Sequence, residues 1–398
     1  MIKKPGIMAT MLLLALLNIV NADVLRIKPY TQWTFDTPIE EVIFRSSGTG
    51  FPIYLIRTGE YVALYDTVGN QFRKLPISPR DVFEINENRS GFVLMQQQAS
   101  IQADRQELLY SFQVFNSKGE PDFTTIHPVD VEGGKLSYQF TNQRTLLITE
   151  PGKPWLLEIN AEDTLLFIES CIETPSQDCQ PTVFAGKLNL PSEVITAASC
   201  ADPEARDSIS TEIRLWNNNT VLGTPMHYAG QLQNIQPLLG TDYYFLELDY
   251  GEGSSLTLFN RISPIGNFPW KTWQITPLGR EAAFVITEKD FNIINLGDGS
   301  LAASFHPIDL STISDAAFLP EWGTFLYIRY EPFFTKSGQQ AYRKFELEGV
   351  NKTGRIVHKS SFGSWTTSLP KISVIGKDLF AIRIHNAVLL YRIELERN

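Results

Sequence analysis

The stretch YVALYDTVGNQFRKLP, residues 61–76, contains the pattern that decides the fold. An apolar run ends in the bulky Tyr65, Asp66 follows it, and a second short run begins after Gly69. Such an apolar run is typical of a strand. Asp favours a turn because its side chain can bond its own backbone. The stretch therefore predicts a β-hairpin.

This pattern returns along the whole chain. Eight apolar stretches end in a bulky residue that usually leads into Asp or Asn, namely Tyr65, Phe115, Ile159, Trp216, Phe259, Ile294, Phe345 and Tyr391. The chain after residue 22 gives about 47 residues to each copy, a period typical of four-stranded blades. We therefore expect an all-β chain that folds as a β-propeller of eight blades, each with four antiparallel strands. Seven blades is the alternative, because the copies at Phe259 and Ile294 lie too close together for four strands each.

The two ends of the chain are expected to meet in one blade. The last copy runs to the C-terminus, so no later strand is left to pair with it. The stretch VLRIKPYTQWTF, residues 24–35, can supply that strand. We expect the N-terminal strand to pair into the last blade and close the ring, which would leave no open inner edge.

Two hairpins carry a resemblance to known propellers. YDTVG (residues 65–69) and NLGDGS (residues 295–300) resemble fragments of the AxDxxTGxxxW blade motif, although neither has its closing Trp. The chain thus resembles quinoprotein-like and WD-repeat-like propellers, although it has no Trp-Asp dipeptide. It is also similar in architecture to the propeller subunit of the bacterial outer-membrane β-barrel assembly machinery. That subunit is lipid-anchored, whereas Asp23 stands where a lipid-bearing Cys would be needed.

The N-terminus predicts export. Lys3 and Lys4 precede an apolar run from Ile7 to Val20, and small Ala22 ends a cleavage site. We expect residues 1–22 to be a signal peptide, and residues 23–398 to form a single propeller domain that is periplasmic or secreted. The 43% hydrophobic and 20% charged residues exclude a disordered chain. The formal net charge of -10 argues against a nucleic-acid partner.

Three cysteines fall in one segment around residues 168–208, which we interpret as an insertion in the propeller. An exported chain meets an oxidising compartment, so a disulfide is expected. Cys171 and Cys179 close the shortest loop and form the preferred pair, and the pairings with Cys200 stay open. A short helix is predicted over 197–208.

Catalytic and metal motifs do not stand out, and we expect no cofactor and no metal. His127 with Asp130 and His306 with Asp309 form a repeated HPxD pattern, and Asp81 belongs to a looser third copy. We expect these repeats where blades connect, so the five residues are candidate binding groups at a channel mouth. The alternative is turn chemistry, which Asp provides after Pro.

The aromatic residues are expected to pack between blades. This interpretation covers Trp33, Trp216, Trp322 and Trp365. The function expected from these observations is that of a monomeric protein-interaction scaffold in the cell envelope, binding an envelope protein and not spanning the membrane. The alternatives are a hydrolase or lyase acting on a polysaccharide-like polymer, and a module that binds a sugar or small ligand.

Overall fold

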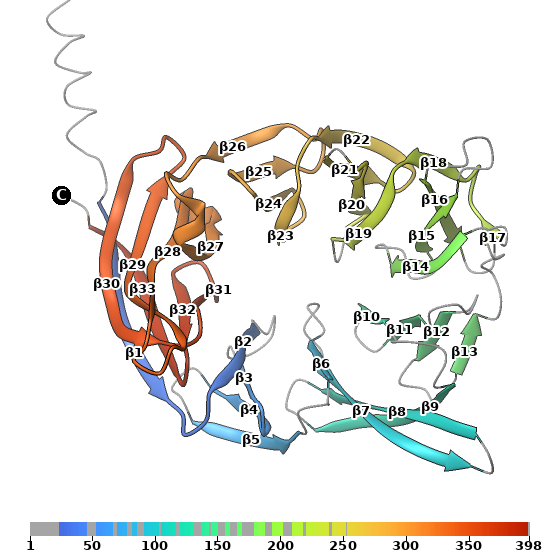
Figure 1. Ribbon diagram of the computed structural model, residues 1–398, viewed down its shortest axis with the longest axis horizontal. Helices are drawn as coiled ribbons and strands as arrows, with labels where there is room; N and C mark the ends of the chain where they lie inside the picture. The colour runs from blue at the N-terminus through green and yellow to red at the C-terminus, as the bar shows by residue number, and fades with distance from the viewer. Residues whose placement is uncertain are drawn as a thin grey trace, which may run out of the picture. The chain divides into compact units, whose positions relative to one another are not determined.

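The computed structural model describes most of the chain after residue 23. The described residues are 24–45, 53–66, 70–77, 82–85, 91–102, 105–116, 120–130, 137–142, 145–149, 156–159, 165–168, 179–187, 193–201, 209–217, 220–238, 241–251 and 253–396. The chain forms two compact units, Met1–Phe44 with Ser311–Asn398, and Arg45–Leu310. Almost all described elements in both units are strands (Figure 1).

The first unit contains two four-stranded sheets. One has the order β27 (Ile313–Leu319), β28 (Thr324–Phe334), β29 (Gln340–Asn351) and β30 (Ile356–Thr366). The other has the order β1 (Val24–Thr34), β33 (Ala387–Glu396), β32 (Leu379–Ile384) and β31 (Lys371–Val374). Two short 3-10 turns flank β27, η2 (Leu310–Thr312) and η3 (Pro320–Trp322).

Six further sheets take up the remaining strands, each following the order of the chain. The sheet that includes the boundary between the units is β2 (Ile39–Arg45), β3 (Ile53–Thr58), β4 (Tyr61–Tyr65) and β5 (Gln71–Pro76). The next two are β6 (Val82–Ile85), β7 (Gly91–Gln102), β8 (Arg105–Asn116) and β9 (Pro121–Asp130), then β10 (Ser137–Asn142), β11 (Thr145–Thr149), β12 (Leu156–Ile159) and β13 (Leu165–Ile168).

The last three sheets follow in the same way. One is β14 (Cys179–Lys187), β15 (Glu193–Ala201), β16 (Ile209–Asn217) and β17 (Thr220–Val221), with β18 (Met226–Ala229) also paired to β16. The other two are β19 (Gln231–Pro237), β20 (Tyr243–Asp249), β21 (Ser254–Asn260) and β22 (Ser263–Phe268), then β23 (Thr272–Leu278), β24 (Ala282–Thr287), β25 (Phe291–Asn295) and β26 (Leu301–Phe305).

The repeated sequence pattern marks the third strand of a sheet and the turn after it. Tyr65 ends β4, and the Asp66 carboxylate accepts a hydrogen bond from the backbone N–H of Asn70 at 2.8 Å. The pattern is placed wrongly in two sheets, because Phe345 lies inside β29 and Tyr391 lies inside β33. The turn after β29 is made by Asn351, whose side chain accepts backbone N–H bonds from Thr353 and Arg355. Phe345 and Tyr391 are followed by Glu346 and Arg392, which do not favour a turn as Asp and Asn do.

The pairing of the N-terminal strand with the last sheet is confirmed. β1 runs antiparallel to β33, from Val24 opposite Glu396 to Thr34 opposite Ala387. The register shifts between Pro29 and Thr31, so Tyr30 is the extra residue of a bulge. β1 therefore supplies the fourth strand that the C-terminal hairpin needs.

Apolar residues cover both faces of the central strands, because successive sheets pack face to face. In β20, Tyr244 and Leu246 pack against residues of β15 and β16, such as Ile213. Phe245, on the opposite face of the same strand, packs against β24 residues such as Val285. Alternate side chains of a strand point to opposite faces, so β20 contributes to two cores.

The cysteine segment contains strand where a helix is predicted. β14 begins at Cys179, and β15 continues as strand to Ala201. The helix prediction is therefore wrong for residues 197–201. Both strands pair with each other, and β15 pairs further with β16. This part of the segment thus belongs to the sheet itself.

Candidate interaction surface

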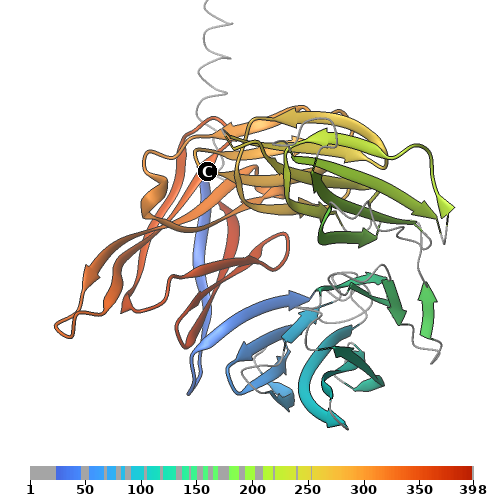
Figure 2. The same cartoon turned by 45° about the vertical axis from the view of Figure 1, so that its right-hand side comes forward.

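Three strands of the first unit continue beyond the four-stranded part of their sheet. The pairing of β27 with β28 ends where Ile313 lies opposite Arg329. β28 continues to Phe334 beside β29, and β29 pairs in turn with β30 as far as Thr366. Figure 2 shows the β28–β29 hairpin extending away from the rest of its sheet. We call residues 330–345 together with 362–366 the projecting sheet.

A bulge at the base of the projecting sheet changes which side chains share a face. The register of β28 with β29 shifts between Arg329 and Glu331, and Lys344 opposite this shift has a φ of 53°. A bulge of this kind bends the strands and turns the next side chains to the other face. Beyond it, the cross-strand partners include Glu331 with Arg343 and Arg343 with Trp365.

The side chains beyond the bulge form a cluster of aromatic and charged groups. The Arg343 guanidinium lies 5.1 Å from the centroid of the Phe333 ring. The Trp365 ring stands edge-on to Phe333, with centroids 6.2 Å apart and an angle of 82° between the planes. Glu331 joins the cluster through Arg343 at 3.5 Å and Lys344 at 2.8 Å. Cation–π and edge-to-face contacts of this kind hold the groups in fixed relative positions.

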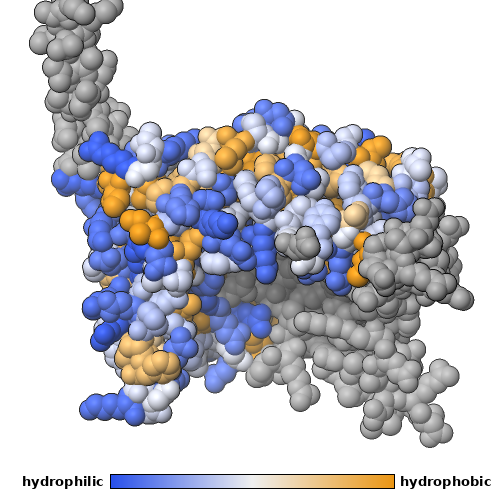
Figure 3. Space-filling view, turned by 45° about the horizontal axis from the view of Figure 1, so that its top comes forward, coloured by the Kyte–Doolittle hydropathy of each residue, from blue (hydrophilic) through white to orange (hydrophobic). Residues whose placement is uncertain are grey.

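This cluster lies open to solvent. Trp365 is 56% exposed, and Phe334, which points to the opposite face from Phe333, is 73% exposed. Figure 3 shows that apolar side chains on the described part of the visible face gather in patches separated by polar residues. A single exposed Leu or Val needs no explanation, but large aromatic side chains gathered with Arg are typical of binding surfaces. The projecting sheet is therefore the strongest candidate site among the described residues.

The hairpin turn at the end of the projecting sheet is held by its own hydrogen bonds. The Thr335 hydroxyl accepts the backbone N–H of Gln339 at 3.1 Å, and the Thr335 N–H donates to the Gln339 carbonyl. Gly338 has a φ of 80°, a conformation that glycine adopts without steric cost. These bonds define the end of the strand that presents Phe334.

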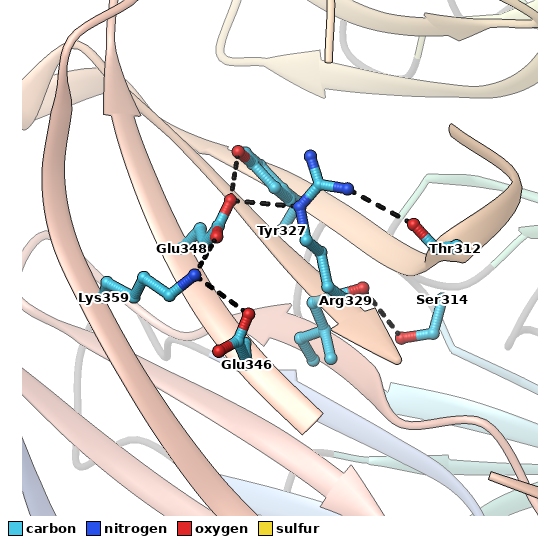
Figure 4. A network of polar contacts seen from close by, with 8 residues as sticks. Thr312, Ser314, Tyr327, Arg329, Glu346, Glu348 and Lys359 are labelled. Atoms are coloured by element: carbon cyan, nitrogen blue, oxygen red, sulfur yellow. Dashed lines mark hydrogen bonds and ion pairs between the residues drawn. The ribbon is translucent and has the colours of Figure 1, made fainter. Parts of the chain in front are cut away.

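A polar network around the buried Glu348 lies below the bulge and ties the three long strands together (Figure 4). The Glu348 carboxylate, on β29, accepts hydrogen bonds from the Tyr327 hydroxyl at 2.6 Å and from Arg329 Nε at 3.1 Å, both on β28. Lys359 Nζ, on β30, donates to the same carboxylate at 2.9 Å. Lys359 also pairs with Glu346 at 2.9 Å. The network thus crosses β28, β29 and β30.

The ionisation of this network is fixed by its contacts. Burial alone would raise the pKa of Glu348, but the hydrogen bonds from Tyr327, Lys359 and Arg329 outweigh it and lower that pKa. Burial, reinforced by Glu348, raises the pKa of Tyr327. Glu348 therefore stays a carboxylate and Tyr327 stays a phenol near neutral pH. Groups held in these forms are poor proton donors and acceptors, so the network acts as a structural clamp.

The histidines of the HPxD repeat occupy different structural positions. His306 follows β26 and pairs with Asp290 across 3.0 Å, and its side chain is 70% exposed. Asp309 is exposed three residues later. His127 and Asp130 lie inside β9, opposite Tyr110 and Glu107 of β8. The repeats were expected where blades connect; His306 lies after the end of β26, whereas His127 lies within β9.

The other predicted residues have a simple outcome. Asp81 and Cys171 lie outside the described residues. Cys179 lies in β14, opposite Cys200 of β15. In the part of the chain that the structure describes, no group of three or more His, Cys, Asp or Glu side chains is arranged to hold a metal ion. In the same part, no helix is long and apolar enough to cross a membrane.

No repeated pattern in the sequence predicts the projecting sheet. The expectation that Trp365 packs between blades is wrong, because more than half of this side chain is exposed. Trp216, by contrast, is buried as predicted. The available signal was the FFTKSG stretch, residues 333–338, where two Phe residues stand directly before a polar turn.

Comparison with known proteins identifies the fold. No protein-family model matches the chain, and no curated protein matches it. Among solved structures, the chain is similar to the WD40 domain of SCAP from fission yeast, with a TM-score of 0.53 and 11% identity over 92% of this chain and 98% of that one. It is also similar to the Dos1 propeller, with a TM-score of 0.54 and 9% identity over 92% of this chain and 95% of that one. The chain is a β-propeller of this WD40-like class, and the likeness extends to fold alone.

Proposed function

We propose that this protein is an exported β-propeller that binds a protein partner in the cell envelope, and that the projecting sheet makes the contact. The cluster of Phe333, Arg343 and Trp365 carries the proposal, and Phe334 presents a further exposed aromatic side chain on the other face of the same hairpin. Trp and Arg are enriched among the residues that dominate binding energy in protein interfaces. Propellers of the WD40-like class supply rigid frames for such contacts.

The projecting sheet suits binding because it is ordered before a partner arrives. The clamp around Glu348 fixes the base of the three strands, and the Thr335 turn fixes the end. A surface that already has its bound shape loses less conformational entropy on association. Little of the free energy gained by burying the aromatic cluster is therefore lost to ordering it on binding.

The charge of this surface indicates the chemistry of the partner. Between residues 330 and 345, Lys336, Arg343 and Lys344 stand against the single acid Glu331, in a chain whose net charge is -10. A locally basic, aromatic surface complements apolar groups flanked by carboxylates. We expect the contact face of the partner to combine these two kinds of group, and the association rate to fall as salt is added.

Photo-crosslinking in the envelope tests the proposal. A photoreactive phenylalanine analogue at position 334 should give one reproducible adduct with a single protein, and Trp365→Ala should abolish it. The same analogue at position 308 provides the control, because Ile308 is 95% exposed but lies in the other unit. The recovered chain should begin at Asp23. Equal adducts at both positions, or none at 334, would argue against the proposal. If the adduct that Trp365→Ala abolishes contains a polysaccharide and not a protein, sugar binding replaces protein binding as the function of this surface.

A further inference from the structure

The strand register brings two of the three cysteines together. Cys179, the first residue of β14, lies directly opposite Cys200 of β15. These residues are 21 positions apart in the sequence, and the hairpin brings them together. From the sequence alone, Cys171 is the preferred partner of Cys179, because only the lengths of the loops that each pair would close can be compared.

The backbone geometry of such a pair suits a disulfide. Opposite residues of an antiparallel pair stand on the same face of the sheet, with Cα atoms about 4.5 or 5.5 Å apart. A disulfide needs Cα atoms roughly 4.4–6.8 Å apart. The two positions can therefore be joined without movement of the strands.

The local ladder gives this crosslink a role. The pairing of β14 with β15 shifts between Cys179 and Val183, so the start of β14 is separated from its regular part. Pro181 lies within this shift and has no N–H to donate. β14 is also the edge strand of its sheet. A covalent bond at Cys179 would hold the end of the strand that hydrogen bonds hold least.

We propose that Cys179 and Cys200 form a cross-strand disulfide and that Cys171 remains a thiol. The two thiols lose two protons and two electrons as the S–S bond forms. The electrons and protons pass by thiol–disulfide exchange to an oxidant of the disulfide class, which becomes two thiols. Oxidised glutathione can serve as this oxidant, so the bond does not depend on the proposed partner or on export.

Peptide mapping tests the pairing directly. The purified full-length protein is equilibrated with oxidised and reduced glutathione, its free thiols are alkylated, and it is digested with trypsin and a Glu-specific protease. Cleavage after Glu173 separates Cys171 from Cys179, and cleavage after Glu193 separates both from Cys200. The expected product joins the peptide of Cys179 to that of Cys200, with Cys171 alkylated. Any other pairing, or three alkylated thiols, would overturn the proposal.

A thermal unfolding series gives an independent readout. Reduction should lower the unfolding temperature of the wild-type protein by about 3–5 °C. Cys171→Ser should keep this difference, and Cys200→Ser should remove it. If Cys171→Ser removes the difference while Cys200→Ser keeps it, the pairing proposed here is wrong.

Discussion

At the scale of single residues, substitution of Glu348, whose carboxylate is buried, should cost the most stability. Three donors hold it, and Tyr327 and Arg329 are themselves largely buried. Removing the Glu348 carboxylate takes a charged acceptor away from Tyr327 and Arg329 in a poorly solvated place. The cost of a substitution here should therefore exceed that of any ion pair at the surface.

Glu348→Gln should lower the free energy of unfolding by about 2–3 kcal/mol, because Arg329 and Lys359 lose their shared anion. The control is Lys344→Ala, which removes an exposed ion pair with Glu331 and should cost less than about 1 kcal/mol. Urea titration monitored by Trp fluorescence measures both values. Equal losses of unfolding free energy in the two variants would show that Glu348 does not hold the three strands together.

The lowered pKa of Glu348 also gives a pH dependence. A carboxyl whose pKa is lower in the folded state stabilises the fold fully above its unfolded pKa and loses that contribution as pH falls through the folded value. The loss should thus begin below the ordinary Glu pKa of 4.5. Denaturation midpoints between pH 6 and pH 3 should fall less steeply for Glu348→Gln than for the wild type. Parallel curves would show that Glu348 does not contribute.

At the scale of elements, the N-terminal strand decides whether the last sheet is complete. Leu25 and Ile27 of β1 are buried in one cluster with Phe380, Tyr391 and Ile393. The strand is also fixed at its surface, where Lys28 pairs with Glu394 at 2.5 Å. β1 thus carries both core and ladder contacts from a part of the sequence far from its partners.

Ile27→Ala should lower the free energy of unfolding by about 2–4 kcal/mol, because it leaves a cavity in this cluster. Lys28→Ala, the next residue and exposed, should cost less than about 1 kcal/mol. Chemical denaturation of the two variants compares them. A small cost at Ile27 would show that β1 is not part of the folded core.

Most elements could be predicted from the sequence, because their signals are local. Tyr65 and Asp66 combine an apolar strand with a turn residue, and such a pair reports its own hairpin. The pattern was wrong at Phe345 and Tyr391, where Glu346 and Arg392 stand in place of the Asp or Asn that favours a turn. Pairing over a long distance, as between β1 and β33, was predictable only from the strand that the last repeat lacked.

The candidate site was much less predictable. The exposure of Trp365 depends on β28–β30 continuing past the end of β27, and no local pattern encodes where a neighbouring strand stops. The HPxD repeat illustrates the opposite error. The HPxD sequence that begins at His127 lies within β9, whereas the one that begins at His306 follows β26, because the two strands differ in length.

At the scale of the whole molecule, charge is distributed unequally between the two units. Residues 45–310 contain 18 Lys and Arg against 32 Asp and Glu, whereas the remaining residues contain 16 against 12, or 14 against 12 from Asp23 onward. The projecting sheet belongs to the unit with the basic excess. An acidic partner would therefore be attracted to this unit and repelled by the other, which favours one orientation of approach.

Two exposed tryptophans distinguish partner binding by the projecting sheet from binding elsewhere on the described surface. Trp365 and Trp273 are each 56% exposed, but they lie in different units. The measurement is the dissociation constant between the partner that crosslinking identifies and each of three proteins: the wild type, Trp365→Ala and Trp273→Ala. Trp365→Ala should weaken binding at least about tenfold, equivalent to about 1.4 kcal/mol, while Trp273→Ala leaves it unchanged. Equal affinity of the wild type and Trp365→Ala for the partner, with both proteins folded, would show that the projecting sheet does not bind it.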